Sequence, residues 1–185
     1  MSSTRALKSR IRSVKSTKQI TKAMQLVAAS KMRKAQDAEK AMEPYTSAAR
    51  ELLTHLAAQG ETDRHPLFQV PEKVRSRLLI VVGTDKGLAG AYDANVLKLY
   101  TKQLMEDEAA GIKNQTIAIG RRANRFVSRL KSVTVAAAYQ DLPDDPSGTQ
   151  LRAIVDTAID AFNTGDIDVV DIVYTEFLSS VTQQA

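Results

Sequence analysis

The sequence predicts an α/β protein in which one long helix precedes a small domain with a mainly parallel sheet. Three observations predict this fold class. No glycine occurs before Gly60, and apolar residues recur every three or four positions between Arg5 and Ala58, which is the periodicity of a helix. From about residue 75 onward, short apolar runs alternate with segments of helical periodicity. Such alternation is typical of strand–helix–strand units and therefore of a parallel sheet.

The first predicted segment, residues 1–59, is a basic helix of the coiled-coil type. Leu7, Ile11 and Val14 lie on one stripe of a helix, and the same spacing recurs further along the segment. At 1.5 Å per residue, about 50 residues extend roughly 75 Å, so the stripe needs a partner helix or a socket to cover it. Proline lacks the backbone donor that a helix interior uses, and we expect the helix to bend near Pro44.

A loop at residues 60–74 separates this helix from a predicted α/β domain at residues 75–185. Pro66 and Pro71 are the stop signals within the loop. The predicted strands are residues 78–82, 116–119, 133–139 and 169–177, and the predicted helices are residues 94–108, 121–131 and 150–163. Along the last of these helices we expect an inward-facing stripe of Leu151, Ile154, Val155, Ala158, Ile159 and Phe162. The order of elements predicts a small Rossmann-like domain.

Composition argues against an active site on this chain. There is no Cys, which excludes disulfides, thiolate metal sites and thiol catalysis. The only histidines, His55 and His65, have no acidic cluster near them in the sequence and make a poor metal site. No apolar run approaches the ~20 residues that span a membrane. We therefore expect no catalytic residue, no cofactor and no metal.

A glycine-rich turn follows the first predicted strand, at the position where doubly wound folds bind phosphate groups. Its sequence, GTDKGLAG at residues 83–90, matches neither the G-x-G-x-x-G pattern nor the P-loop pattern. Gly120 and Arg121, rather than an acidic residue, follow the second predicted strand. We interpret the segment as a structural turn that needs glycine, with a partner-contacting loop or a phosphate-binding enzyme site as alternatives. The residues assigned to the turn are Gly83, Asp85, Gly87 and Gly90.

Charge is divided unequally between the two parts of the chain. Residues 1–36 contain ten basic residues and no acidic one. A solvated charged face would be expected to mix both signs. Three functions can explain the excess: binding of nucleic acid, attachment to a membrane surface, or insertion into an acidic protein socket. The first aromatic residue is Tyr45, so the stacking platforms of single-strand binders and the aromatic anchors of membrane-surface helices are missing from the basic stretch.

Residues 11–36, IRSVKSTKQITKAMQLVAASKMRKAQ, closely resemble the N-terminal signature of the gamma subunits of F-type ATP synthases. The block ITKAMQLVAASKMRKAQ, at residues 20–36, is long, ungapped and unusual in composition. The segment TDKGLAGAYDANV, at residues 84–96, resembles the family's T-D-R/K-G-L-C-G stretch, with Ala89 in place of the frequent Cys and Asp93 in place of a frequent Asn. The similarity extends over essentially the whole chain.

The resemblance implies a non-catalytic rotor subunit. In the family, the N-terminal helix pairs with a C-terminal helix as an antiparallel coiled coil inside a hexamer of alternating alpha and beta subunits. The α/β domain lies beside the epsilon subunit and the ring of membrane c subunits. Proton flow turns the ring and the shaft, and the shaft drives the catalytic beta subunits. The implied location is the cytoplasmic face of the bacterial plasma membrane, with membrane contact only through the complex and with no nucleic acid as partner.

The resemblance also implies which residues meet the catalytic ring. Basic side chains suit acidic segments on the surrounding subunits, and methionines adapt to a sliding contact. The expected partner contacts are Ile20, Lys22, Met24, Val27, Lys31, Met32, Arg33 and Lys34. The family continues into a long C-terminal helix, whereas this sequence ends at Ala185, so we expect that helix to be absent here. Binding of nucleic acid by a basic helix on an α/β scaffold is the alternative function.

Overall fold

The computed structural model describes residues 3–59, 65–143, 146, 148–179 and 182–185. The chain divides into two compact units, Met1–Thr62 and Asp63–Ala185. Among the described residues, no helix combines the length and the apolar character needed to cross a membrane.

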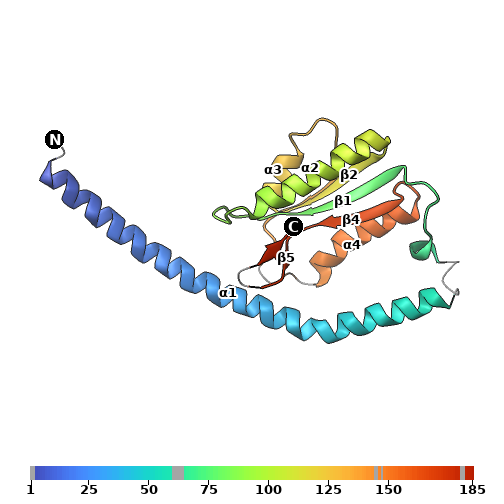
Figure 1. Ribbon diagram of the computed structural model, residues 1–185, viewed down its shortest axis with the longest axis horizontal. Coiled ribbons are helices and arrows are strands. Elements are labelled where there is room, and N and C mark those ends of the chain that lie inside the picture. The colour runs from blue at the N-terminus through green and yellow to red at the C-terminus, as the bar shows by residue number, and fades with distance from the viewer. Residues whose placement is uncertain (1–2, 60–64, 144–145, 147, 180–181) are drawn as a thin grey trace. The chain divides into compact units, whose positions relative to one another are not determined.

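The first unit consists of one helix, α1, which runs from Thr4 to Ala58 (Figure 1). The Ser3 side chain caps its start by accepting a hydrogen bond from the backbone N–H of Arg5 at 3.3 Å. With 55 residues the helix extends about 80 Å. None of its residues is buried. Within its own unit, α1 therefore gains no stability from the packing of an apolar face.

The helix continues through Pro44 without a break, as a single curved ribbon (Figure 1). Proline has no N–H to offer, so the carbonyl group one turn earlier, that of Lys40, lacks its usual helical donor. Just after the proline, the hydroxyl group of Thr46 lies 3.0 Å from the carbonyl oxygen of Glu43 and 3.3 Å from that of Met42. These side-chain contacts supply polar partners to the carbonyl groups beside the proline.

The second unit is built on a four-stranded parallel sheet in the order β3-β2-β1-β4. The strands are β1 (Ser76–Val82), β2 (Lys113–Ile119), β3 (Thr134–Tyr139) and β4 (Val169–Val173), and the helices between them are α2 (Tyr92–Ala110), α3 (Arg121–Val127) and α4 (Gly148–Asn163). A single 3-10 turn, η1 (Pro66–Phe68), precedes β1. The predicted α/β class and Rossmann-like parallel sheet are confirmed.

The two faces of the sheet are covered by different helices. Figure 1 shows α2 and α3 on one face and α4 on the other. Along β1, Leu79 and Val81 belong to the core under α2 and α3, whereas Leu78 and Ile80 belong to the core under α4. Because successive side chains of a strand point to opposite faces, β1 is apolar without interruption. This is the physical basis of the apolar run at the first predicted strand.

Three buried polar side chains of this unit have polar partners. The hydroxyl groups of Tyr100 and Thr116 lie 2.9 Å apart, and both side chains are fully buried. Burial raises the pKa of Tyr100 above its usual value, an effect that the hydrogen bond to Thr116 partly offsets. The Asp107 carboxylate, also buried, lies 3.0 Å from Nε of Arg77, whose guanidinium group also pairs with Asp171.

Several predicted boundaries are wrong, and local packing explains why. The helix predicted at residues 121–131 ends at Val127, beyond which the backbone tightens into i→i+3 hydrogen bonds. The strand predicted at residues 169–177 ends at Val173, because its register with β1 runs out at Val81. The following residues instead form β5 (Glu176–Phe177), which pairs antiparallel with β6 (Gln183–Gln184).

The inward stripe predicted along α4 is also partly wrong. Ile154 and Ala158 are buried, but Leu151 is 45% exposed and Val155 is 51% exposed. The reason is that β4 is the edge strand of the sheet. Among the described residues, no further strand lies beyond β4 to cover that side of α4.

Candidate partner-binding surfaces

The glycine turn at residues 83–90 lies at the carboxyl edge of the sheet, where β1 leads into α2. The backbone is crowded there. Gly120 has φ +89°, and a Cβ atom at this position would lie 2.2 Å from the carbonyl oxygen of Gly83. A Cβ atom on Gly83 would lie 3.1 Å from the Cβ atom of Ala123 in α3. The ends of β1 and β2 therefore approach each other at a distance that a side chain at Gly120 would prevent, and a side chain at Gly83 would press against α3.

Two carboxylates of the chain itself fix the turn. Oδ1 of Asp85 accepts a hydrogen bond from the backbone N–H of Arg121, the first residue of α3, at 2.9 Å. Oδ1 of Asp93 accepts one from the backbone N–H of Thr84 at 2.8 Å, and the hydroxyl group of Thr84 lies 2.8 Å from Oδ2 of Asp93. Helix N-termini at this edge are where doubly wound folds bind phosphate groups. Here the Asp85 carboxylate ties the turn to the start of α3, which favours the structural interpretation of the turn.

The predicted turn residues occupy distinct places in this arrangement. Gly90 has φ +60°, a conformation that favours glycine. Gly87 faces Arg122, since a Cβ atom there would lie 2.9 Å from the Nη2 atom of that arginine. Leu88, between them, has φ +67° and a side chain that is 93% exposed. A bulky residue in the left-handed region is uncommon and marks a turn held in place by its surroundings.

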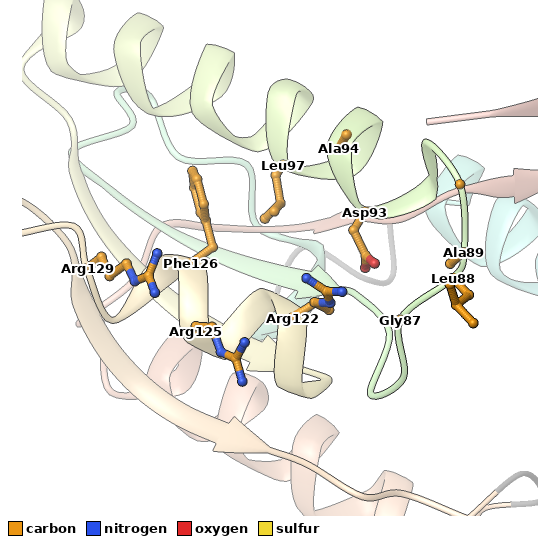
Figure 2. Close-up of a pocket in the computed structure, with 11 residues that line it drawn as sticks. Gly87, Leu88, Ala89, Asp93, Ala94, Leu97, Arg122, Arg125, Phe126 and Arg129 are labelled. Carbon is orange, nitrogen blue, oxygen red and sulfur yellow. The ribbon is translucent and has the colours of Figure 1, made fainter. Parts of the chain in front are cut away.

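A hollow of about 420 Å3 lies between the glycine turn and α3 (Figure 2). Leu97 of α2 and Phe126 of α3 contribute apolar lining, and Asp93 lies at one side. Three arginines, Arg122, Arg125 and Arg129, also line it. Our sequence interpretation missed this cluster. The available signal was the i, i+3, i+7 spacing of the three arginines, which places them on one side of a helix.

The predicted partner contacts all lie on α1, but they do not form one surface. At 100° per residue, Ile20, Met24, Val27, Lys31 and Lys34 share one face of the helix. Lys22 and Arg33 lie on the opposite face, with Met32 between the two. The four apolar members of the set, Ile20, Met24, Val27 and Met32, are between 45% and 58% exposed. All eight residues can be contacted together only by partners that surround the helix.

The described residues contain no group of three or more His, Cys, Asp or Glu side chains placed to hold a metal ion. Of the two histidines, His55 lies 3.9 Å from Glu51 on the exposed surface of α1. The ring of His65 packs edge-on against Phe68.

Comparison with known proteins assigns the family. The model of the family described as ATP synthase matches residues 3–185. The chain is 37% identical over 184 residues to the ATP synthase gamma chain of Cupriavidus metallidurans, and 38% identical to that of Ralstonia nicotianae. It is also 38% identical over 185 residues to the gamma chain of Polaromonas naphthalenivorans. The chain belongs to the ATP synthase gamma family. All of the chain aligns with these gamma chains, and it spans 62% of the length of the first two and 64% of the third.

Proposed function

We propose that this chain acts as the gamma subunit of an F-type ATP synthase, the central rotor shaft that couples proton-driven rotation to ATP synthesis and hydrolysis on the beta subunits. The proposed shaft is residues 1–59, the linker is residues 60–74, and the domain beside the rotor ring is residues 75–185. In this role the chain contributes shape and charge, and the catalytic groups belong to other subunits. The location follows from the role: the peripheral sector at the cytoplasmic face of the bacterial plasma membrane.

The observation that carries the proposal is the surface of α1. The helix has 55 residues, no buried residue and an apolar side chain at nearly every turn of its first half. Such a helix requires partners along its whole length. Residues 1–36 of the chain carry positive charge only, which would suit an acidic lining in the partners. The eight proposed contact residues, distributed around α1, fit a ring of alpha and beta subunits that encloses a shaft.

The geometry of the second unit is consistent with a domain that attaches the shaft to other subunits, and not with an enzyme. The carboxylate of Asp85 accepts a hydrogen bond from the start of α3 and that of Asp93 accepts one from Thr84, so the turn is held by contacts within the chain itself. We propose that this unit contacts the epsilon subunit and the ring of c subunits. Binding of nucleic acid, the alternative from the sequence, gains no support from the comparisons, all of which name ATP synthase gamma chains.

The proposal is tested by reversing charge on α1 in the native host. The variant replaces Lys31, Arg33 and Lys34 with Glu. Membranes carrying it should hydrolyse ATP with much less proton pumping per ATP, because the shaft would repel an acidic lining. The matched control reverses three basic residues of the other unit, Lys73, Lys113 and Arg152, and should leave the ratio of pumping to hydrolysis nearly unchanged.

Two measurements are made on each preparation. Intact-mass spectrometry of the tagged complex determines whether alpha, beta and epsilon subunits are retained. The rate of proton pumping is followed with a pH-sensitive dye and the rate of ATP hydrolysis by phosphate release. Their ratio gives the number of protons pumped per ATP hydrolysed. Coupling that is identical in the α1 variant and the control, with both chains incorporated, would contradict the proposed shaft contacts. Failure to recover alpha and beta subunits with the wild-type chain would contradict the rotor role itself.

A further inference from the structure

We propose that the hollow between the glycine turn and α3 binds a phosphate-bearing anion through Arg122, Arg125 and Arg129 (Figure 2). The inference concerns a site on the second unit and does not depend on the rotor role of α1. The ligand class is a small organic phosphate or a phosphorylated headgroup, which share the chemistry that arginine recognises.

The positive charges of the three arginines are not balanced by neighbouring side chains among the described residues. Within the part of the chain that the structure describes, none of the three guanidinium groups has an ion-pair or hydrogen-bond partner. Asp93 is the one carboxylate among the residues lining the hollow, and both of its oxygens already accept hydrogen bonds from Thr84. Three cations lining one concave surface repel each other, and an anion among them relieves that repulsion. Arginine favours phosphate in particular, because its planar group presents paired donors to two oxygens at once.

The second argument is the shape of the site. Arg122 and Arg125 lie in α3, and Arg129 follows two residues after its end, so all three come from one short segment. The volume of about 420 Å3 falls within the range of small-molecule pockets. A compact hollow is better suited to binding a phosphate group than an extended acidic peptide, which needs a long groove. Leu97 and Phe126 offer an apolar wall for the organic part of the ligand.

The third argument is the position of Gly87. A side chain there would come within 2.9 Å of Nη2 of Arg122, so glycine is what allows this guanidinium group to lie against the turn. The φ of Gly87 is not in the left-handed region, so the backbone itself does not require glycine. Gly87→Ala therefore displaces Arg122 with little cost to folding, and it is a probe of the site that removes no charge.

The experiment is a titration of the 185-residue chain with pyrophosphate, followed by backbone amide NMR in about 0.15 M salt, where charges beyond about 8 Å are screened. The signals must be assigned to individual residues, because the basic helix α1 also attracts anions without a specific site. The wild-type chain should give saturable shifts at the amides of Gly87 and Gly90. Replacing Arg122, Arg125 and Arg129 with Gln should weaken binding by tenfold or more, since each charge-assisted hydrogen bond contributes about tenfold.

Two further variants make the result specific. Gly87→Ala should also weaken binding, by about threefold to tenfold, if Arg122 is a ligand in its present position. The control variant replaces Lys73, Lys113 and Arg152 with Gln, which removes the same charge elsewhere in the unit, and it should bind like wild type. Tyrosine fluorescence confirms that each variant is folded. Competition by ATP, or by vesicles containing phosphatidylglycerol but not by vesicles of phosphatidylcholine alone, identifies a soluble phosphate or a lipid headgroup as the source.

Three outcomes would overturn the proposal. One is a response confined to α1 amides. Another is an affinity that falls equally in the arginine variant and in the charge-matched control, which would mean binding by overall charge. The third is saturable binding of a glutamate-rich peptide at these arginines with no saturable binding of pyrophosphate, which would assign the hollow to an acidic protein segment.

Discussion

Gly120 offers the sharpest test of how the carboxyl edge of the sheet is built. We expect Gly120→Ala to destabilise the second unit by about 4 kcal/mol, through two costs that add. The backbone at Gly120, φ +89° and ψ 147°, lies in a region used almost only by glycine, and holding alanine there costs about 1–3 kcal/mol. The new Cβ atom would also lie 2.2 Å from the carbonyl oxygen and 2.7 Å from the carbonyl carbon of Gly83.

The second cost follows from what surrounds the new atom. These neighbours are backbone atoms, so relief requires the glycine turn to move by about 1 Å toward an ordinary contact distance. That movement would stretch the hydrogen bonds from Gly83 N–H to the carbonyl oxygen of Ile119, at 2.8 Å, and from Arg122 N–H to that of Thr84, at 2.9 Å. Overpacking of this kind costs about 1–3 kcal/mol, and each weakened hydrogen bond adds up to about 1 kcal/mol.

Gly111→Ala is the matched control. Gly111 also has a positive φ, +72°, but no atom lies within 4 Å of a Cβ atom built there. It should cost only about 1 kcal/mol, the price of the left-handed conformation. The assay is urea unfolding followed by tyrosine fluorescence, since the chain has no Trp and four of its five tyrosines lie in the second unit. Equal losses of stability in the two variants would refute the steric argument.

Three further predictions concern polar groups of the second unit, each measured by urea unfolding. Tyr100→Phe and Thr116→Val should each cost about 1–2 kcal/mol by leaving a buried hydroxyl group unpaired, while the double variant should cost less than the sum. Arg77→Met should cost about 3–5 kcal/mol because it leaves the buried Asp107 carboxylate without its cation, and adding Asp107→Leu should restore most of the loss. Backbone N–H groups at the start of β1 hold the pKa of Asp168 below its usual value, so its stabilising effect is present above pH ~4 and is lost as the pH falls through the folded pKa. Asp168→Asn should therefore destabilise the chain at pH 7, and this deficit should shrink as the pH falls below about 4; a deficit independent of pH would contradict this account.

The sequence was sufficient for the kind and order of α1, of the four strands of the parallel sheet and of the helices between them, because each is signalled locally. Apolar periodicity identified α1, and a continuous apolar run identified β1, whereas the short pair β5 and β6 was not predicted. Boundaries were less accurate because partners decide them. The last strand of the sheet ends at Val173 since β1 offers no partner beyond Val81, and nothing in the composition of residues 174–177 shows this.

The candidate surfaces were predictable to the extent that they lie within one segment. The excess of basic residues along α1 is visible in the sequence because these residues are close in the chain. The hollow lined by Arg122 was not, since it joins two segments that the residues between Leu97 and Arg122 separate in the chain. The same is true of the bond between Asp85 and the start of α3, which spans 36 residues. Contacts of this kind depend on the closure of the sheet, which the periodicity of single segments does not encode.

Because α1 has no buried residue, the stability of this helix depends on how much of its partners is present. In the proposed role, a segment whose apolar side chains are covered by partners becomes more stable as the concentration of those partners rises. While the partners are scarce, the backbone of α1 unfolds locally more often and can be cleaved by proteases. Once the partners are abundant, α1 is protected. The lifetime of the chain in the cell would then follow the abundance of its partners. The number of copies of this chain would then match the number of partner complexes, because unbound copies would be degraded without a dedicated regulator.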